Sequence, residues 1–327
     1  MSVETAPLAP PTPRRIRLSR PRGDRIFRGL TIGTGLGTFL ILALIGTFLL
    51  IKALPAFHLA GLHFFTVREW NPDGTTHHFG IAAVLYGTVV IAAVALALAL
   101  PVSMCVALFI AEYAPRRVRP AMTSLVDLLA AVPSLIYGLW GFFFVQPHLL
   151  GLARWLSVHV HAIPIFRVPT RSYSSSPFMA GVVVALMVTP IATSVMREVF
   201  SRTPPGEREA ALALGATKWA IVRSVVIPFG RGGIVGGAML GLGRALGETI
   251  AVAIILSPSF IITPYFLQTG GNSVASLIAN RFGDASQSIG IPALMAAGLA
   301  LFLMTLVVNT LASLIVARSR SGKGVEI

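Results

Sequence analysis

Residues 232–257 read GGIVGGAMLGLGRALGETIAVAIILS, an apolar run that is long enough to cross a bilayer as one helix. Arg244 lies about twelve residues from either end of this run, and Glu248 follows it at a spacing of four. Each ionised group at the centre of a membrane helix costs about 2.5–3.5 kcal/mol on insertion scales. The spacing places both charges on one helical face, where they can pair, and Gly237 and Gly241 crowd the same side. Two interpretations follow: a structural pair that holds helices together, or a cationic site on a transport path.

The composition excludes an ordinary soluble domain. The mean hydropathy is +0.80, 55% of the residues are apolar and 12% are charged, whereas soluble domains carry about 25% charged residues. Runs that are poor in charge predict an all-α membrane protein with six transmembrane helices. These runs are 29–51, 80–110, 128–147, 177–196, 232–257 and 285–317.

The distribution of basic residues predicts the orientation of the chain. With both termini in the cytoplasm, the inside segments hold 19 of the 26 Lys and Arg, and the outside loops hold five. This is the positive-inside asymmetry of membrane proteins, so the net charge of +14 does not indicate nucleic-acid binding. We expect residues 1–29 to form a disordered basic cytoplasmic tail, 30–317 a permease domain with a cytoplasmic loop at 201–231, and 318–327 a second tail.

Prolines and glycines within the predicted helices indicate hinges or close packing. The candidates are Pro101, Pro133, Gly138, Pro190, Gly237 and Gly241. Asp127 lies near the inner end of the third run, where it could reach the membrane interface or an inside arginine.

The sequence predicts neither a metal site nor an ATP site in this chain. All seven histidines fall in predicted outer segments, and no Cys or carboxylate completes a metal-ligand spacing. The chain has no GxxxxGK[ST] motif, so we expect no cofactor and no enzymatic activity of its own.

Residues 203–228 form the most informative cytoplasmic segment, TPPGEREAALALGATKWAIVRSVVIP. We expect Thr203 to cap a helix that begins at Pro204, and Gly215 to separate that helix from a second one. The segment suits either an amphipathic element at the membrane surface or a docking surface for a cytoplasmic partner.

This segment resembles the cytoplasmic loop of the ABC importer permeases. The loop in that family has the form EAA, three residues, Gly, nine residues, and then a hydrophobic residue, a spacer and Leu-Pro. The matching positions here are Glu209, Ala210, Ala211, Gly215, Val225, Ile227 and Pro228. Ile227 replaces Leu and Val225 replaces Ile, and both changes are mild.

Within that family, the chain is similar to the phosphate importer permeases of the PstC type. The stretches that carry the similarity are 24–28, 86–88, 131–134, 137–141 and, above all, 243–249. The sister PstA type usually follows the Thr of that last motif with Ala-Pro, whereas Ile250 and Ala251 stand here. Asp127 departs from the Glu that the family tends to have. The resemblance covers about residues 24–317.

The resemblance implies a six-helix, MetI-like permease in the plasma membrane of a prokaryote. It would work with a PstA-type permease, two PstB-type subunits that bind ATP and Mg²⁺, and a PstS-type phosphate-binding protein outside. Arg244 would contact phosphate, and Glu248 would hold Arg244 while the path is empty. Glu209, Ala210, Ala211 and Gly215 would couple the chain to the ATPase.

Several alternatives remain open from the residues alone. One is a permease of the same class for molybdate, sulfate or phosphonate. Another is an ion-coupled secondary transporter in which Glu248 or Asp127 relays protons, and a third is a structural scaffold. The residues also leave open whether the second permease subunit is a different chain or a second copy.

Overall fold

The computed structural model describes residues 22–160 and 162–319 of the chain. The chain divides into two units, residues 1–48 and 49–327, and helix α1 (Arg22–Ala60) runs through the boundary. The helix begins at Arg22, so residues 22–29 are helical where the sequence predicts a disordered tail. Residues 1–21 of that predicted tail, and 320–327 of the C-terminal one, lie outside the described residues.

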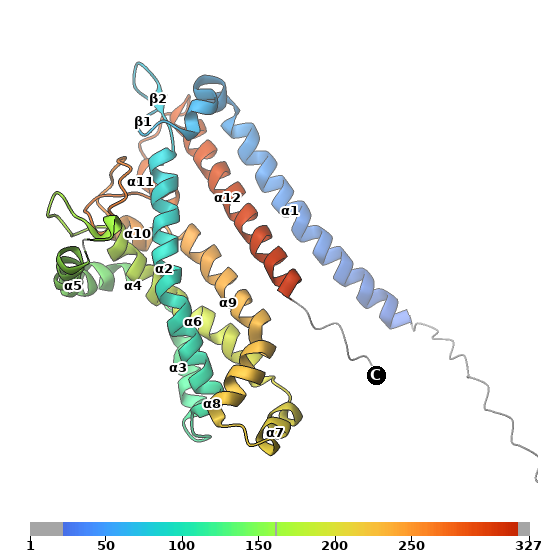
Figure 1. Ribbon diagram of the computed structural model, residues 1–327. Coiled ribbons are helices and arrows are strands. Elements are labelled where there is room, and N and C mark those ends of the chain that lie inside the picture. The colour runs from blue at the N-terminus through green and yellow to red at the C-terminus, as the bar shows by residue number, and fades with distance from the viewer. Residues whose placement is uncertain (1–21, 161, 320–327) are drawn as a thin grey trace, which may run out of the picture. The chain divides into compact units, whose positions relative to one another are not determined.

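Six helical segments in the described residues are long and apolar enough to cross a membrane, which confirms the predicted number. They are Gly23–Phe65, Ala82–Tyr113, Ser134–His159, Pro177–Ser201, Lys218–Gly247 and Gly290–Leu314. Shorter elements connect or interrupt them (Figure 1). From residue 61 onward the elements are η1 (Gly61–Phe65), β1 (Trp70–Asn71), β2 (His78–Phe79), α2 (Ala82–Leu108), η2 (Phe109–Tyr113), α3 (Arg119–Ala131), α4 (Ser134–Trp140), η3 (Gly141–Val145), α5 (Gln146–His159), η4 (Pro164–Phe166), α6 (Pro177–Ser201), α7 (Pro205–Ala213), α8 (Lys218–Ile221), η5 (Val222–Val226), α9 (Ile227–Gly247), α10 (Ile250–Ile255), α11 (Val274–Arg281) and α12 (Gly290–Ser319).

Helices α2, α6 and α9 pack against one another and form the centre of the second unit. A row of glycines on α9 lets its backbone approach α6 closely, as small residues do between membrane helices. A Cβ added at Gly241 would lie 2.6 Å from Val188 Cγ1, and one at Gly237 would lie 3.0 Å from the Ala192 carbonyl oxygen. Glycine at these positions therefore sets the distance between the two helices.

A second packed region lies at the end opposite α7 and α8. The antiparallel β1–β2 hairpin pairs Trp70 with Phe79, and Phe79 is buried in a cluster that includes residues of α11 and α12. In the same region, Thr88 Oγ1 accepts a hydrogen bond from the Val274 backbone N–H at 3.0 Å. Both partners are buried, so this bond ties α11 to α2 without leaving a polar group unpaired.

The third predicted helix is divided. Helix α3 ends at Ala131, Val132 is extended with ψ 130°, and α4 begins after Pro133. The reason is local, because the residue before a proline is driven from the helical to the extended conformation. The helical path then continues through η3 and α5 to His159, well past the predicted end at 147.

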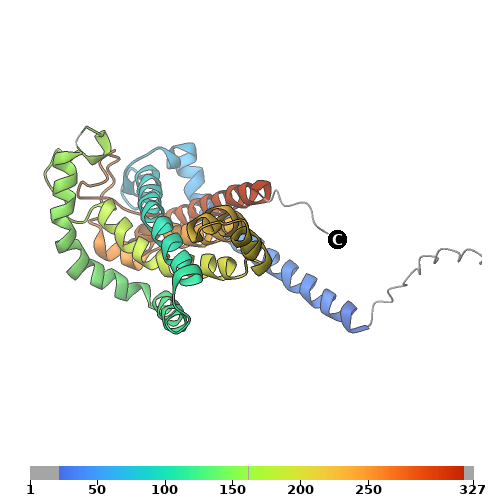
Figure 2. The same cartoon turned by 60° about the horizontal axis from the view of Figure 1, so that its bottom comes forward.

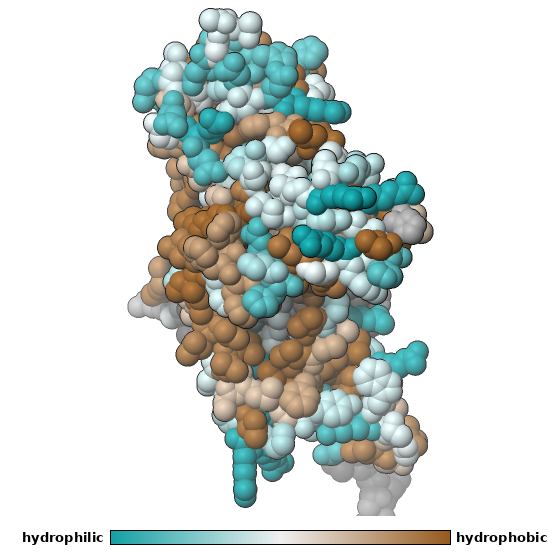
Figure 3. All heavy atoms as spheres, turned by 90° about the vertical axis from the view of Figure 1, so that its left-hand side faces the viewer, coloured by the Kyte–Doolittle hydropathy of each residue, from teal (hydrophilic) through white to brown (hydrophobic). Residues whose placement is uncertain are grey.

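The apolar surface suits a bilayer. Figure 3 shows a broad area of hydrophobic side chains over the middle of one face, mostly on its left, with hydrophilic side chains at the top, at the bottom and along part of the right-hand side. Large exposed apolar residues on α4, η3 and α5 include Leu139, Phe143 and Trp155. In water such a surface would be a liability, whereas in hydrocarbon it is the expected exterior.

Candidate substrate path and coupling surface

Arg244 lies in the last turn of α9, which ends at Gly247. The sequence predicts one continuous helix from 232 to 257 with Arg244 at its middle, and this prediction is wrong. Glu248 is extended, with φ −69° and ψ 126°, and the separate helix α10 begins at Ile250. The chain is weak in helix propensity here, because Gly243 and Gly247 lie within five residues of Glu248. In Figure 1 α10 lies beside α4, away from the line of α9.

Glu248 does not pair with Arg244, contrary to the prediction. Its side chain is buried, and its Oε1 accepts a hydrogen bond from the Ala251 backbone N–H at 3.4 Å. The i,i+4 geometry that would join the two charges requires a helix through both residues, and the extended Glu248 removes it. The carboxylate serves the first turn of α10 instead, where backbone N–H groups lack helical partners.

Within the part of the chain that the structure describes, the Arg244 guanidinium has no carboxylate partner. The side chain is half-buried, and its buried Nε has no hydrogen-bond acceptor among residues 22–160 and 162–319. Space beside it is open, since a Cβ added at Gly243 or Gly247 would meet no atom within 4 Å. A partly desolvated guanidinium with open space beside it is suited to bind an oxyanion.

Helix α4 brings a second polar group toward Arg244. Tyr137 lies within electrostatic range of the guanidinium, and its hydroxyl donates to the Leu129 carbonyl oxygen at 3.0 Å. Gly138 permits this approach, because a Cβ there would lie 2.8 Å from Ala251 Cα. The breaks at Pro133 and Glu248 thus bring two short helices, α4 and α10, into contact beside Arg244.

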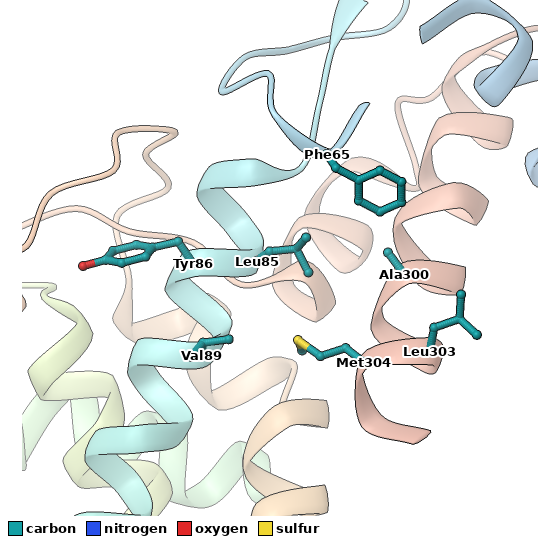
Figure 4. A pocket seen from close by; sticks show the side chains of 7 residues that line it. All are labelled: Phe65, Leu85, Tyr86, Val89, Ala300, Leu303 and Met304. Carbon is teal, nitrogen blue, oxygen red and sulfur yellow. The ribbon is translucent and has the colours of Figure 1, made fainter. Parts of the chain in front are cut away.

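Two pockets that are lined mostly by apolar residues are not suited to an anion. One pocket of about 380 Å³ lies between α2 and α12 and is lined by Phe65, Leu85, Tyr86, Val89, Ala300, Leu303 and Met304. Its one side-chain hydroxyl, on Tyr86, points away from the other lining residues (Figure 4) and donates to the Thr263 carbonyl oxygen at 2.7 Å. A second pocket, of about 370 Å³, contains the hydroxyl-bearing Tyr137 and Thr189 but is otherwise lined by apolar and aromatic residues of α2, α3, α4 and α6, Pro190 among them.

Asp127 contacts an inside arginine, one of its two predicted environments. Its Oδ1 accepts a hydrogen bond from Ser194 Oγ at 3.0 Å and lies 3.8 Å from Arg197 Nη2. Arg197 also donates to Thr123 Oγ1 at 3.2 Å. These contacts join α3 to α6 near their predicted cytoplasmic ends.

The remaining proline candidates lie inside continuous helices. Helix α2 continues through Pro101, and α6 continues through Pro190. Ser103 Oγ crosses between the two helices and donates to the Thr189 carbonyl oxygen at 3.1 Å. A side chain thus bonds to the backbone of the neighbouring helix close to both prolines.

The predicted coupling residues lie on α7 and the turn after it (Figure 2). Glu209 and Ala210 are exposed, and Ala211 is half-buried. Gly215 has φ +80°, a conformation that favours glycine and ends α7, as predicted. Thr203 is not the cap: it is buried, and its hydroxyl donates to the Phe200 carbonyl oxygen at 2.8 Å, so α7 begins only at Pro205.

Sequence reasoning missed two features of this region. Tyr137 belongs to one of the motifs that carry the resemblance, and nothing in its spacing indicates that it lies within electrostatic range of Arg244. Glu112 carries no prediction from the sequence, but it lies in η2 and forms an ion pair with Arg208 at 2.8 Å. The signal that could have found it is an acid at the end of an otherwise uncharged run of thirty residues, 82–111.

Comparison with known proteins places the chain in a family. Residues 103–321 match the family described as "Binding-protein-dependent transport system inner membrane component". The chain belongs to this family. The permease is 40% identical over 304 residues to the phosphate transport system permease protein PstC 2 of Mycobacterium tuberculosis, covering 92% of this chain and 94% of that one. It is 36% identical over 287 residues to a probable PstC of Methanocaldococcus jannaschii, covering 86% and 90%.

Solved structures confirm the fold. The permease resembles a chain of a bacterial alginate ABC transporter in complex with a periplasmic protein, with a TM-score of 0.59 and 16% identity, covering 93% of this chain and 99% of that chain. A second alginate transporter structure gives a TM-score of 0.55. The predicted fold of an ABC importer permease is therefore correct.

Membership also decides between the classes of function that the sequence left open. The permease is the multi-pass membrane component of an ABC transport complex, which contains an ATPase and depends on a binding protein. This excludes the ion-coupled secondary transporter and the purely structural scaffold.

Proposed function

We propose that this permease carries inorganic phosphate inward, driven by ATP hydrolysis in partner subunits. The observation that supports the proposal best is the Arg244 guanidinium, which is half-buried, lacks a carboxylate partner and borders open space. The choice of phosphate as the substrate is supported by the PstC relatives, which are phosphate transport permeases and align over most of both chains. Molybdate, sulfate and phosphonate remain the competing oxyanions, since a guanidinium also binds these.

Arg244 would provide charge-assisted hydrogen bonds to the oxygens of a passing phosphate. Glu248 would have a different role from the predicted one of holding Arg244 while the path is empty. While its carboxylate bonds to the Ala251 N–H, it neither neutralises Arg244 nor faces the anion alone. One guanidinium beside open space would give a weak, transient contact, which conduction requires because tight binding would slow release.

The α7 surface would dock the ATPase. Beside the exposed Glu209 and Ala210, it presents the large apolar side chains of Leu212, Leu214 and, from α8, Trp219, all exposed. Several large apolar side chains exposed together are typical of a protein interaction site. The partners would be a PstA-type permease, two PstB-type ATPase subunits and a PstS-type binding protein.

Reconstitution of the full complex in liposomes tests the proposal. We expect uptake of radiolabelled phosphate that requires the binding protein outside and ATP inside. Excess unlabelled molybdate, sulfate or phosphonate should leave this uptake unchanged, whereas unlabelled phosphate should compete with it. Uptake of another oxyanion in place of phosphate would contradict the assignment of the substrate.

A further inference from the structure

We propose that Glu112 and Arg208 form the joint through which movement of the coupling helix α7 reaches the transmembrane helices. The inference rests on the proposed function only in taking transport to be driven by an ATPase that docks on α7. The proposal rests on two contacts. They are made by Glu112 and Tyr113, consecutive residues of η2, and each contact reaches a different helix of the coupling loop.

The first contact is the ion pair between Glu112 and Arg208. Arg208 Nη2 lies 2.8 Å from Glu112 Oε1, and the side chains are 27% and 9% exposed. The three other ion pairs in the described part of the chain each have a side chain that is at least half exposed. A close ion pair withdrawn from water is screened little by salt, and separating its charges is costly, so displacement of one partner should displace the other.

Arg208 also holds a third element. The same Nη2 donates to the Phe200 carbonyl oxygen at 2.9 Å, in the last turn of α6. The Phe200 ring is fully buried against α9, where a Cβ at Gly230 would lie 2.3 Å from Phe200 Cε1. One guanidinium on α7 is therefore connected to α2 and α6 directly, and to α9 through Phe200.

The second contact comes from the next residue, Tyr113. The Lys218 Nζ lies 4.7 Å from the centre of the Tyr113 ring, in a cation–π geometry. Lys218 is the first residue of α8, which follows the Gly215 turn. Glu112 and Tyr113 thus hold α7 and α8 on either side of that turn.

The local backbone suits such a joint. Glu112 and Tyr113 lie in η2, a single π-helical turn that ends α2. Turns of this kind are rare and occur often at functional sites. Helix α7 itself contributes one half-buried residue, Ala211, to the apolar cluster around Phe200, whereas the buried Ile221, Val222 and Val226 of that cluster lie beyond the Gly215 turn, in α8 and η5. The polar contacts therefore supply much of the connection between α7 and the transmembrane helices.

The test compares Glu112→Gln with Glu198→Gln in the reconstituted complex. Glu198 pairs with Arg202 at the same end of the molecule, but both side chains are more than half exposed, so loss of this pair should change nothing. For Glu112→Gln we expect the phosphate taken up per ATP hydrolysed to fall at least about fivefold, within the usual range of coupling between distant sites. The wild-type complex must first show ATP-driven uptake. Failure there counts against the proposed function and not against the joint.

The exchanged pair, Glu112→Arg with Arg208→Glu, separates coupling from stability. We expect it to recover uptake per ATP relative to either single change, at equal amounts of assembled complex. If Glu112→Gln lowers assembly, Lys218→Met replaces it, because Lys218 is exposed and its loss leaves no buried charge. Wild-type coupling in the assembled single variants, or no recovery in the exchanged pair, would overturn the proposal.

Discussion

Arg208 and Arg244 are both partly buried arginines near helix ends, but their surroundings differ. Arg208 has a carboxylate at 2.8 Å and a carbonyl oxygen at 2.9 Å. Arg244 has no carboxylate partner in the described residues, and the nearest acid along the chain, Glu248, bonds to a backbone N–H instead. The comparison indicates that an arginine paired with a carboxylate fixes structure, whereas one that has no carboxylate and lies beside open space is available to a ligand.

Replacement of each arginine by alanine should give the largest difference in stability between the two sites. Arg208→Ala leaves Glu112 buried without a partner, so we expect it to destabilise the permease by roughly 3 kcal/mol. Arg244→Ala leaves no buried carboxylate without a partner, so it should change stability by less than about 1 kcal/mol. Thermal unfolding of the purified complex measures both. Equal destabilisation would show that Arg244 has a structural partner after all.

The packing of α9 offers a second test of the same contrast. Gly241→Val would place its side chain against Val188 and should destabilise the permease by about 1–3 kcal/mol through overpacking. Gly243→Val, two residues further along the helix and next to Arg244, meets no atom within 4 Å and should be close to neutral for stability. Gly243→Val should instead lower phosphate uptake. A stability loss at Gly243 as large as at Gly241 would mean that the space beside Arg244 is filled.

A substitution that strains the turn at Gly215 should destabilise the coupling loop by about 1–3 kcal/mol and leave the rest of the permease unchanged. Gly215→Val forces a β-branched residue into φ +80°, so we expect weaker coupling of ATP hydrolysis to uptake with the permease fold intact. The matched control is Gly206→Val, which lies in α7, has no positive φ and meets no atom within 4 Å. Loss of assembly in place of weaker coupling would show that the turn is structural.

The smallest expected change in stability concerns Asp73, a carboxylate in the β1–β2 turn that accepts hydrogen bonds. Hydrogen bonds from Ser286, first from its side chain, lower the pKa of Asp73 below its ordinary value. Stability from this contact is present above the unfolded-state pKa and is lost as pH falls through the folded-state pKa. We therefore expect Asp73→Asn to increase hydrogen exchange in the β1–β2 hairpin at neutral pH, and the difference from wild type to vanish in strong acid. A difference that persists in acid would contradict this explanation.

Much of the fold could be predicted from sequence, because hydrocarbon imposes long apolar runs and the positive-inside asymmetry sets their direction. Gly215 was predictable for a similar reason, since a motif and a backbone requirement coincide there. Pro133 was predicted as a hinge, and the third helix is divided there. The break at Glu248 was not predicted, because hydropathy averages over short interruptions of a helix. Spacing along an assumed continuous helix then gave a false Arg244–Glu248 pair.

The Glu112–Arg208 pair was missed for a different reason. The two residues are 96 positions apart, and neither lies in a pattern that indicates its partner. Contacts of this kind depend on how α2, α6 and α7 meet, which a single sequence does not encode in its local periodicity.

Uptake of radiolabelled phosphate by liposomes that contain the Arg244→Ala complex tests the central claim most directly, with Arg244→Lys and Arg154→Ala, an exposed outer arginine, measured in parallel. We predict that Arg244→Ala lowers uptake by about 10- to 100-fold, the loss of a charge-assisted hydrogen bond of about 1.5–3 kcal/mol. Arg244→Lys should retain part of the uptake, Arg154→Ala should retain all of it, and binding-protein-stimulated ATP hydrolysis should persist in each. Wild-type uptake by an assembled Arg244→Ala complex would contradict the account.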